Sequence, residues 1–305
     1  MPLHPEILDR APAEGARTVV LAFLAEARER ADRLAGGSDT EALHDFRVSV
    51  RRLRSTLRAW RDGLGASVRD KDLRRLRRVA RATSEARNAE VLAAWVGEIA
   101  GSLPRTHRPA AEWLTSRLAR TVQESDLAGS LERFRAGADS LSRRLERESP
   151  PASTGTFAAA LAGKIRKQAA SLEASLSRVV TADDALLAHR ARIEGKRLRY
   201  LLEPMGTAAG IEARRAVRRL KRLQDLLGDL NDANLAAAAV KEARRKDRPG
   251  AGLRPGLLAL EGLAGKRAGL LFARLRSEVL ESRGAATLAS ALQVASALET
   301  RARGF

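Results

Sequence analysis

Apolar residues recur along most of the chain at spacings of three and four residues, which is the period of one face of an α-helix. Short runs rich in glycine, proline and serine interrupt this pattern, as in "GGSD" at 36–39 and "ESPPASTG" at 148–155. The segments between the interruptions predict helices over residues 13–35, 40–62, 67–101, 108–147, 156–180, 182–203, 210–246, 256–282 and 285–302. Pro150 and Pro151 divide the first eight of these four and four, so we expect an up-and-down helical architecture in two halves.

The composition of the chain supports an all-α, globular protein. Hydrophobic residues make up 44% of the sequence and charged residues 30%, whereas the aromatic residues that strands favour are only 3%. No run approaches the roughly 18 apolar residues of a membrane-spanning helix, and the first residues lack the basic and then apolar order of a signal peptide. The chain has no cysteine, which excludes a disulfide framework. We therefore expect a soluble protein of the cytoplasm with no membrane insertion.

The charge of the chain narrows the classes of partner. The formal net charge is +19 and the isoelectric point is about 11.4. A field of this strength attracts polyanions, and the resulting binding weakens as salt is added. The candidate partners are nucleic acid, an anionic membrane surface and polyphosphate.

A basic stretch occurs twice along the chain. The segment "LHDFRVSVRRLRS" at 43–55 matches "AHRARIEGKRLRY" at 188–200 at a constant offset of 145 residues. The match pairs His44 with His189, which is informative because the chain has only four histidines. The helices that follow, at 73–92 and 217–236, also correspond. These matches predict an internal repeat of helix pairs.

The basic residues of the repeat fall on one side of their helices. Since each helical residue turns about 100°, each copy is predicted to have one basic stripe beside one apolar stripe. In the first copy the stripe contains His44, Arg47, Arg51, Arg54 and Arg58, and in the second His189, Arg192, Lys196, Arg199 and Tyr200, with Arg52 and Arg197 at the edges. The following helices add Arg74, Arg77, Arg78 and Arg81, and Arg214, Arg218, Lys221 and Arg222. Arginine presents a planar fork of donors that matches phosphate oxygens, so phosphate is the natural partner.

Several of these features also have a purely structural interpretation. A basic stripe is often a solvated helix face, and the two histidines either donate to phosphate when protonated or hold neighbouring helices. Tyr200 either donates a hydrogen bond to phosphate or packs its ring. Asp225, Asp229 and Asp232 have a spacing that suits a metal site, but pairing with arginines of neighbouring stripes is the favoured interpretation.

The pattern His-x-x-Arg-(Val/Ile)-x-x-(Arg/Lys)-Arg-Leu-Arg, present twice and followed by "LQDLLGDLNDANL" at 223–235, resembles the CHAD domain, the conserved histidine α-helical domain. The resemblance implies a single domain over residues 1–305. It implies two four-helix bundles, at 10–149 and 154–283, related by a pseudo-two-fold, with a helical extension at 284–305. Basic helices would line a central groove or pore that binds inorganic polyphosphate, and the protein would be associated with polyphosphate granules.

The resemblance also implies which residues contact phosphate. They are His44, Arg47, Arg51, Arg54, His189, Arg192, Lys196, Arg199 and Tyr200, with Arg74, Arg78, Arg218, Lys221 and Arg222 as additions. The first half departs from the family pattern, because Ser84 and Asn88 stand where the family has a glycine and the aspartate of an Arg-Asp pair. The second half keeps Gly228 and Asp232 at the corresponding positions.

The leading hypothesis is therefore non-enzymatic binding of inorganic polyphosphate, with targeting to polyphosphate granules or their organisation. One alternative is a general polyanion or nucleic-acid binding protein, although the basic stripes contain only one aromatic residue for stacking. Another alternative is a metal-dependent polyphosphate-processing enzyme, although the stripes offer almost only cations. We expect no metal and no cofactor; weak nucleic-acid binding and granule-associated proteins are further candidate interactions.

Overall fold

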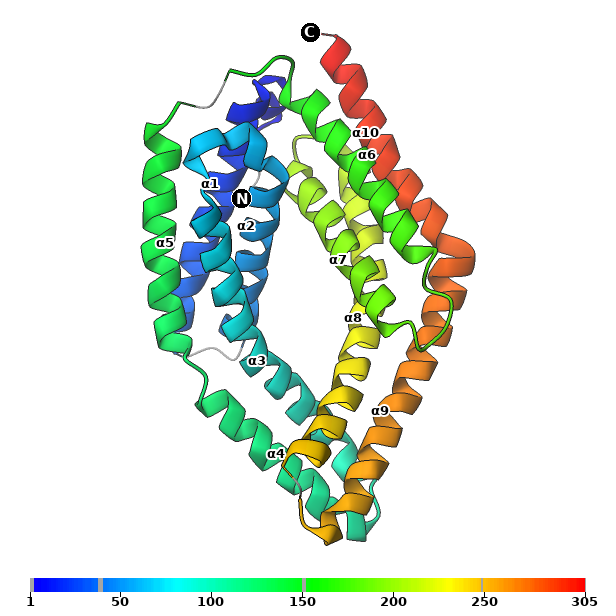
Figure 1. Cartoon of the computed structure of the whole chain (residues 1–305). Helices are drawn as coiled ribbons and strands as arrows, with labels where there is room; N and C mark the ends of the chain where they lie inside the picture. The colour runs from blue at the N-terminus through cyan, green and yellow to red at the C-terminus, as the bar shows by residue number, and fades with distance from the viewer. Residues whose placement is uncertain (1–2, 38–40, 150–151, 248, 305) are drawn as a thin grey trace.

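The computed structural model describes residues 3–37, 41–149, 152–247 and 249–304 (Figure 1). Every regular element within these ranges is helical, which confirms the all-α prediction. The α-helices are α1 (Pro12–Ala35), α2 (Ala42–Leu64), α3 (Asp70–Ala100), α4 (Arg108–Gln123), α5 (Leu127–Arg147), α6 (Phe157–Leu176), α7 (Ala185–Leu202), α8 (Gly210–Lys246), α9 (Arg254–Leu275) and α10 (Gly284–Arg303). Short turns of 3₁₀-helix join some of them, and a π-helical segment, η6 (Arg276–Arg283), joins α9 to α10. Pro150 and Pro151, which are predicted to divide the halves, lie outside the described residues.

The prediction of one helix over residues 108–147 is wrong. The structure has two helices there, α4 and α5, with a break at residues 124–126. Asp126 begins α5 by accepting a hydrogen bond from the Gly129 N–H at 3.0 Å, which satisfies one of the free donors of the first turn. The break matters for the fold because it lets α4 leave the helices around α5 and pack elsewhere.

Each half of the chain arranges its helices with the same set of neighbours. In the first half α1 packs against α2 and α5, and α3 against α2 and α5. In the second half α6 packs against α7 and α10, and α8 against α7 and α10. Helix α10, predicted as an extension, is thus one of the four helices of its group (Figure 1). The two bundles and the pseudo-two-fold relation between them stay predictions.

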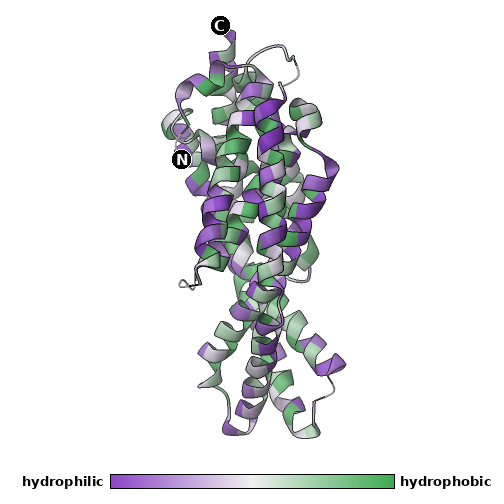
Figure 2. Ribbon diagram, turned by 90° about the vertical axis from the view of Figure 1, so that its left-hand side faces the viewer, coloured by the Kyte–Doolittle hydropathy of each residue, from purple (hydrophilic) through white to green (hydrophobic). Residues whose placement is uncertain are grey.

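Two apolar cores hold the described residues together. The larger core joins both halves and includes Phe46, Phe134, Phe157 and Leu198. The second core is separate and lies between the C-terminal parts of α3 and α8 and the helices α4 and α9. Figure 1 shows α4, α9 and the C-terminal parts of α3 and α8 at the lower end of the molecule. In the side view of Figure 2, individual helices carry both hydrophilic and hydrophobic residues, as amphipathic helices do. Helices α3 and α8 therefore run from one core into the other.

The start of α6 forms a tight joint between the halves. The Phe157 N–H donates to the carbonyl oxygen of Arg10 at 2.7 Å, and the Phe157 ring lies against Trp60 with centroids 4.8 Å apart. A Cβ atom on Gly15 of α1 would lie 2.3 Å from Phe157 Cγ. Only glycine therefore lets α1 approach the phenylalanine this closely.

Gly15→Ala should lower the free energy of unfolding by about 1–3 kcal/mol, because the added methyl group overpacks the joint. Gly163→Ala is the matched control, since Gly163 lies on the exposed side of α6 with no atom within 4 Å of the added carbon. The control should raise stability by about 0.5–1 kcal/mol through its higher helix propensity. Urea unfolding measures both changes, and equal stabilisation by the two variants would contradict the tight joint.

Candidate functional site

Basic side chains from both halves of the chain meet in one cavity. The cavity has a volume of about 680 Å³, and His44, Arg47 and Arg51 of α2 line it together with Arg192 and Lys196 of α7. A second cavity of about 330 Å³ is lined by Arg47, Arg51, Arg54, Arg77, Ala80, Arg81 and Ser84. The two cavities share Arg47 and Arg51. We call them the inner cavity and the outer cavity.

The local sequence explains why these cations face a cavity. The adjacent face of α2 carries Phe46, Val50, Leu53 and Leu57, all of which are buried in the larger core. Helices α2 and α7 contact each other, so their basic stripes lie against the same space. Burial of the apolar stripes thus fixes where the cations point.

The arginines that line the cavities are partly desolvated in a cationic environment. Burial, then the neighbouring Arg51 and Arg87, lower the pKa of Arg47 to about 10. Burial, then Arg58 and Arg51, lower the pKa of Arg54 to about 10 as well. The pKa of Arg192 is also lowered, by burial and then by Arg51. All three remain charged near neutral pH, and anionic groups placed among them would relieve their repulsion.

Corresponding arginines of the two halves have different partners. Arg47 Nη2 donates to Ser84 Oγ at 3.2 Å, whereas the corresponding Arg192 faces Gly228, which has no side chain to accept a bond. The Nε atoms of Arg47 and Arg192 are both buried without a hydrogen-bond partner. A buried unpartnered donor is costly, so both arginines have donor capacity that a ligand oxygen would satisfy. Ser84, which departs from the family pattern, therefore supports one of the cavity arginines.

Lys196 is the most strongly perturbed of these side chains. Burial, followed by Arg51, Arg192 and Arg199, lowers the pKa of Lys196 to about 6. Its amine is therefore largely neutral near pH 7 while the cavity holds no ligand. A bound anion would favour the protonated form, so binding and protonation of Lys196 are coupled.

The two histidines of the repeat occupy different environments. His44 lines the inner cavity, and burial and then Arg87 lower its pKa, which keeps the imidazole neutral near pH 7. His189 lies outside both cavities, with Nδ1 2.6 Å from Asn231 Oδ1. The structure thus places only His44 where it could meet a ligand of the cavity.

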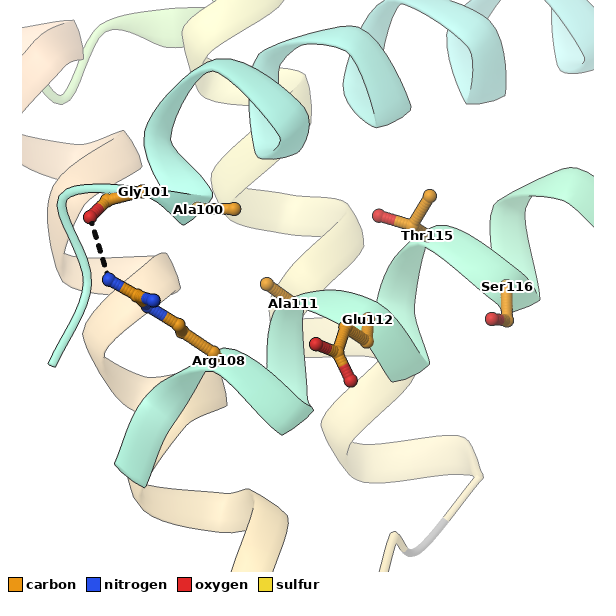
Figure 3. Close-up of a pocket in the computed structure, with 7 residues that line it drawn as sticks. All are labelled: Ala100, Gly101, Arg108, Ala111, Glu112, Thr115 and Ser116. Atoms are coloured by element: carbon orange, nitrogen blue, oxygen red, sulfur yellow. Dashed lines mark hydrogen bonds between the residues drawn. The ribbon is translucent and has the colours of Figure 1, made fainter. Parts of the chain in front are cut away.

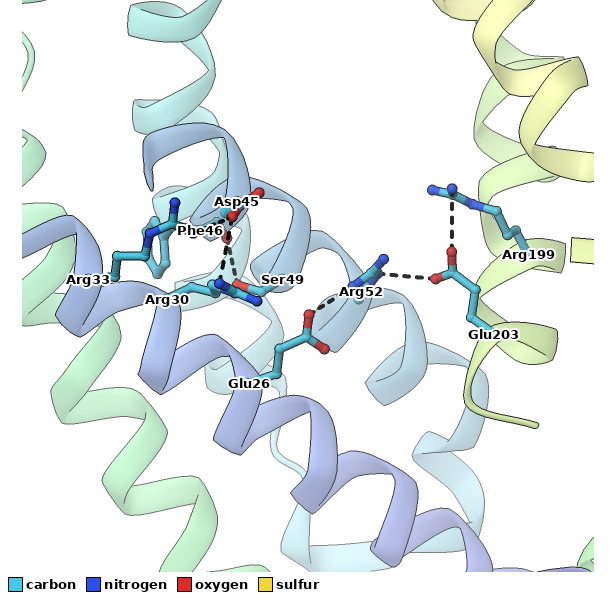
Figure 4. A network of polar contacts seen from close by, with 9 residues as sticks. All are labelled: Glu26, Arg30, Arg33, Asp45, Phe46, Ser49, Arg52, Arg199 and Glu203. Atoms are coloured by element: carbon cyan, nitrogen blue, oxygen red, sulfur yellow. Dashed lines mark hydrogen bonds and ion pairs between the residues drawn. The ribbon is translucent and has the colours of Figure 1, made fainter. Parts of the chain in front are cut away.

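Three residues of the predicted set lie in a polar network beside the cavities. Arg52 Nη1 is 2.8 Å from Glu26 of its own half, and Arg52 Nε is 3.1 Å from Glu203 of the other half (Figure 4). Arg199 also reaches Glu203, at 3.4 Å, and its guanidinium lies 5.3 Å from the centre of the Tyr200 ring. Tyr200 itself is buried at 3% exposure. This network connects the halves, and its arginines already have carboxylate partners.

The remaining predicted residues lie on exposed or ion-paired surface. Arg197 is paired with Glu194 at 2.7 Å. The exposed residues outside both cavities are Arg58, Arg74, Arg78, Arg218, Lys221 and Arg222. The pKa of Arg58 is lowered by burial and then by Arg197 and Arg77, which shows that it continues the cationic surface beyond the outer cavity.

The sequence did not reveal several charged residues of the inner cavity. The cations are Arg87, Arg117 and Arg267, and the acids are Glu85, Glu90 and Glu98. Asp229 and Asp232, which the sequence had singled out, also line the cavity. Arg87 is 3.0 Å from Glu90, and Arg117 pairs with Asp247. The spacing of three residues between Arg87 and Glu90 is the only sequence signal among these pairs. Burial and then Asp232 raise the pKa of Asp229.

Three further features of the described residues narrow the chemistry of the chain. These residues contain no group of three or more His, Cys, Asp or Glu side chains that could hold a metal ion. A further depression of about 460 Å³ lies between the end of α3 and the start of α4 (Figure 3). Its one arginine, Arg108, donates to the carbonyl oxygen of Gly101 at 3.1 Å, so this depression lacks a cationic cluster. In the part of the chain that the structure describes, no helix has the length and apolarity needed to cross a membrane.

Lys196→Met should stabilise the ligand-free protein, most strongly in acid. Lys196 has a pKa of about 6 in the folded protein and 10.5 ordinarily, so the unfolded chain binds more protons between these values. The destabilisation that Lys196 causes is therefore complete below pH 6 and is relieved as the pH rises toward 10.5. Melting temperatures across this range should show a gain that narrows with pH. Lys221→Met, an exposed control on α8, should show no such trend; a constant gain for Lys196→Met would contradict the coupling.

Comparison with known proteins assigns the chain to a family. The family model described as "CHAD domain" matches residues 18–241. The chain resembles the crystal structure of the CHAD domain from the plant Ricinus communis, with a TM-score of 0.69 and 22% identity, over 91% of this chain and 93% of that one. It also resembles PptA from Streptomyces chartreusis, with a TM-score of 0.64 and 21% identity, over 88% of this chain and 100% of that one. None of the curated proteins compared with it matches. Because the family match spans most of the chain, the protein belongs to the CHAD domain family.

Proposed function

We propose that this protein binds inorganic polyphosphate through the inner and outer cavities and does not process it. The observation that carries the proposal is the meeting of Arg47, Arg51, Arg192 and Lys196, from two distant parts of the chain, around one space. The CHAD domain family is associated with polyphosphate binding in general. The arrangement of cations in this chain supports the same ligand.

The physical argument rests on charge density. Each phosphate of the chain carries about one charge, and every phosphate that Lys or Arg neutralises releases counter-ions, so affinity accumulates along the polymer. The Nε atoms of Arg47 and Arg192 have no hydrogen-bond partner, so these arginines retain donor capacity for phosphate oxygens. Tyr200, the only aromatic residue of the basic stripes, is buried, which disfavours base stacking and therefore nucleic acid as the main ligand.

The proposal includes no turnover. Hydrolysis of a phosphate chain needs a metal ion or a general base beside the reacting phosphate, and the side chains around Arg51 in the outer cavity are mainly further arginines. In the inner cavity His44 is a base that is neutral near pH 7. Release of phosphate with Mg²⁺ or Mn²⁺ that disappears in His44→Ala would overturn this part of the proposal.

We extend the proposal to the cell. A protein with a net charge of +19 and a polyphosphate site would gather where the polymer is concentrated. We therefore place it in the cytoplasm, attached to polyphosphate granules or organising them. A fluorescent fusion that stays diffuse in cells rich in granules would contradict this placement.

Charge reversal at Arg51 and Lys196 tests the binding site. Arg51→Glu with Lys196→Glu should weaken binding of long-chain polyphosphate by roughly 100-fold or more, because two charge-assisted contacts are replaced by repulsion. Isothermal titration calorimetry measures the affinity, and circular dichroism verifies that the helical fold is kept.

The control is Arg143→Glu with Lys167→Glu, which changes the net charge equally at exposed positions of α5 and α6. This control should bind nearly as well as the unchanged protein. An equal loss in both double variants would indicate a general polyanion surface instead of a site. Competition with duplex DNA at moderate salt makes the same distinction, since equal affinities for DNA and polyphosphate would oppose the proposal.

A further inference from the structure

Charge reverses along both long helices that run between the two cores. On α3 a basic segment with Arg74, Arg77, Arg78 and Arg81 is followed by Glu85, Glu90 and Glu98, and by Arg87, which is paired with Glu90. On α8 a basic segment with Arg214, Arg218, Lys221 and Arg222 is followed by Asp225, Asp229 and Asp232, and basic residues return only from Lys241, beyond the lining of the inner cavity. In both helices the basic segment is followed by at least one acid before the second core begins, at Ala89 on α3 and Ala236 on α8. The cationic surface therefore has a direction.

Contacts between α2 and α3 give the same direction. Arg47 lies beside Ser84, at 3.2 Å, while further along α2 both Arg54 and Arg58 lie close enough to Arg77 for their pKa values to be lowered by it. The row from Arg47 to Arg58 thus leads away from the second core. The shared arginines Arg47 and Arg51 stand at its inner end.

The lining of the inner cavity becomes apolar and acidic beyond that inner end. Its lining includes Ala89, Leu92, Trp95, Leu118 and Ala236, all of which belong to the second core. Val91 and Leu235, which are 36% and 44% exposed, add apolar surface to this floor. The cations at this end already have acidic neighbours. Arg87 is paired with Glu90 and Arg117 with Asp247, and Arg267 interacts electrostatically with Asp229. A polyanion that continued past Lys196 would meet carboxylates and apolar side chains.

We infer that the inner cavity holds an end of a polyphosphate chain, with the terminal phosphate among Arg47, Arg51, Arg192 and Lys196 and the rest of the chain leaving along Arg54 and Arg77. This inference rests on the proposed function. A terminal phosphate has three non-bridging oxygens and an additional ionisable charge, whereas an internal phosphate has two such oxygens. The meeting point of three arginines and Lys196, whose amine a bound anion would protonate, suits the group with more charge and more acceptors.

Chains with blocked ends test the inference. Long-chain polyphosphate whose two terminal phosphates carry a bulky, neutral phosphoramidate group keeps nearly all of its charge but cannot place a free terminal phosphate among the basic side chains of the inner cavity. The unblocked polymer should bind at least about tenfold more tightly than the blocked one in calorimetry. With unblocked chains of increasing length, the number of protein molecules bound at saturation should stay at two per chain, one for each end.

Two variants separate the end site from the outer path. Arg192→Gln with Lys196→Gln should weaken binding of the unblocked chain and remove its advantage over the blocked chain. Arg54→Gln with Arg77→Gln should weaken binding of both chains by the same factor. Equal affinity of the unchanged protein for blocked and unblocked chains, or a stoichiometry that grows with chain length, would overturn the end site and leave the proposed function standing. Absence of binding to either polymer would overturn both.

Discussion

Mutual repulsion of cations across the space between α2 and α7 is the constraint on which the arrangement of this molecule depends. Burial and then Arg51 lower the pKa of Arg47, Arg192 and Lys196, so each of these side chains is held near charge of its own sign. Apolar packing has to offset this repulsion, and the larger core does so because it is shared by both halves. The Phe157 joint and the Arg52–Glu203 contact add connections between the halves beside the cavity. The cations can therefore stay close together because packing elsewhere in the fold offsets their repulsion.

The second core decides where the cationic surface ends. Helices α3 and α8 pass through both cores without a break, so the same rigid elements carry arginines at one level and apolar residues at another. Helix α4 reaches this core only because the chain turns at Asp126. A continuous helix from 108 to 147 would have left the ends of α3 and α8 uncovered by α4. The shape of the inner cavity thus depends on the three-residue break at 124–126, which lies far along the chain from the repeated basic motif.

Much of the helical pattern follows from local sequence, because amphipathic periodicity and helix breakers act over a few residues. The same periodicity correctly places Arg47, Arg51, Arg192 and Lys196 on one side of their helices and against a common cavity. Membership of that cavity could not be predicted for Arg87 or Asp229, since it depends on distances between helices. Arg52 shows the same limit, because its partner Glu203 lies in the other half and outside the repeated motif. The different positions of His44, inside the inner cavity, and His189, outside both cavities, also depend on tertiary surroundings, since their motifs are alike in sequence.

The buried Nε atoms of Arg47 and Arg192 have a consequence for the entropy of binding. A free arginine side chain on a surface samples many rotamers, and ordering it on a ligand costs about 0.5–1.5 kcal/mol. Side chains whose guanidinium stems are already enclosed have lost much of that freedom when the chain folds. The cost of ordering the donors is thus met before any anion arrives. A ligand of this cavity encounters a preorganised charge array, and more of each contact's free energy contributes to affinity.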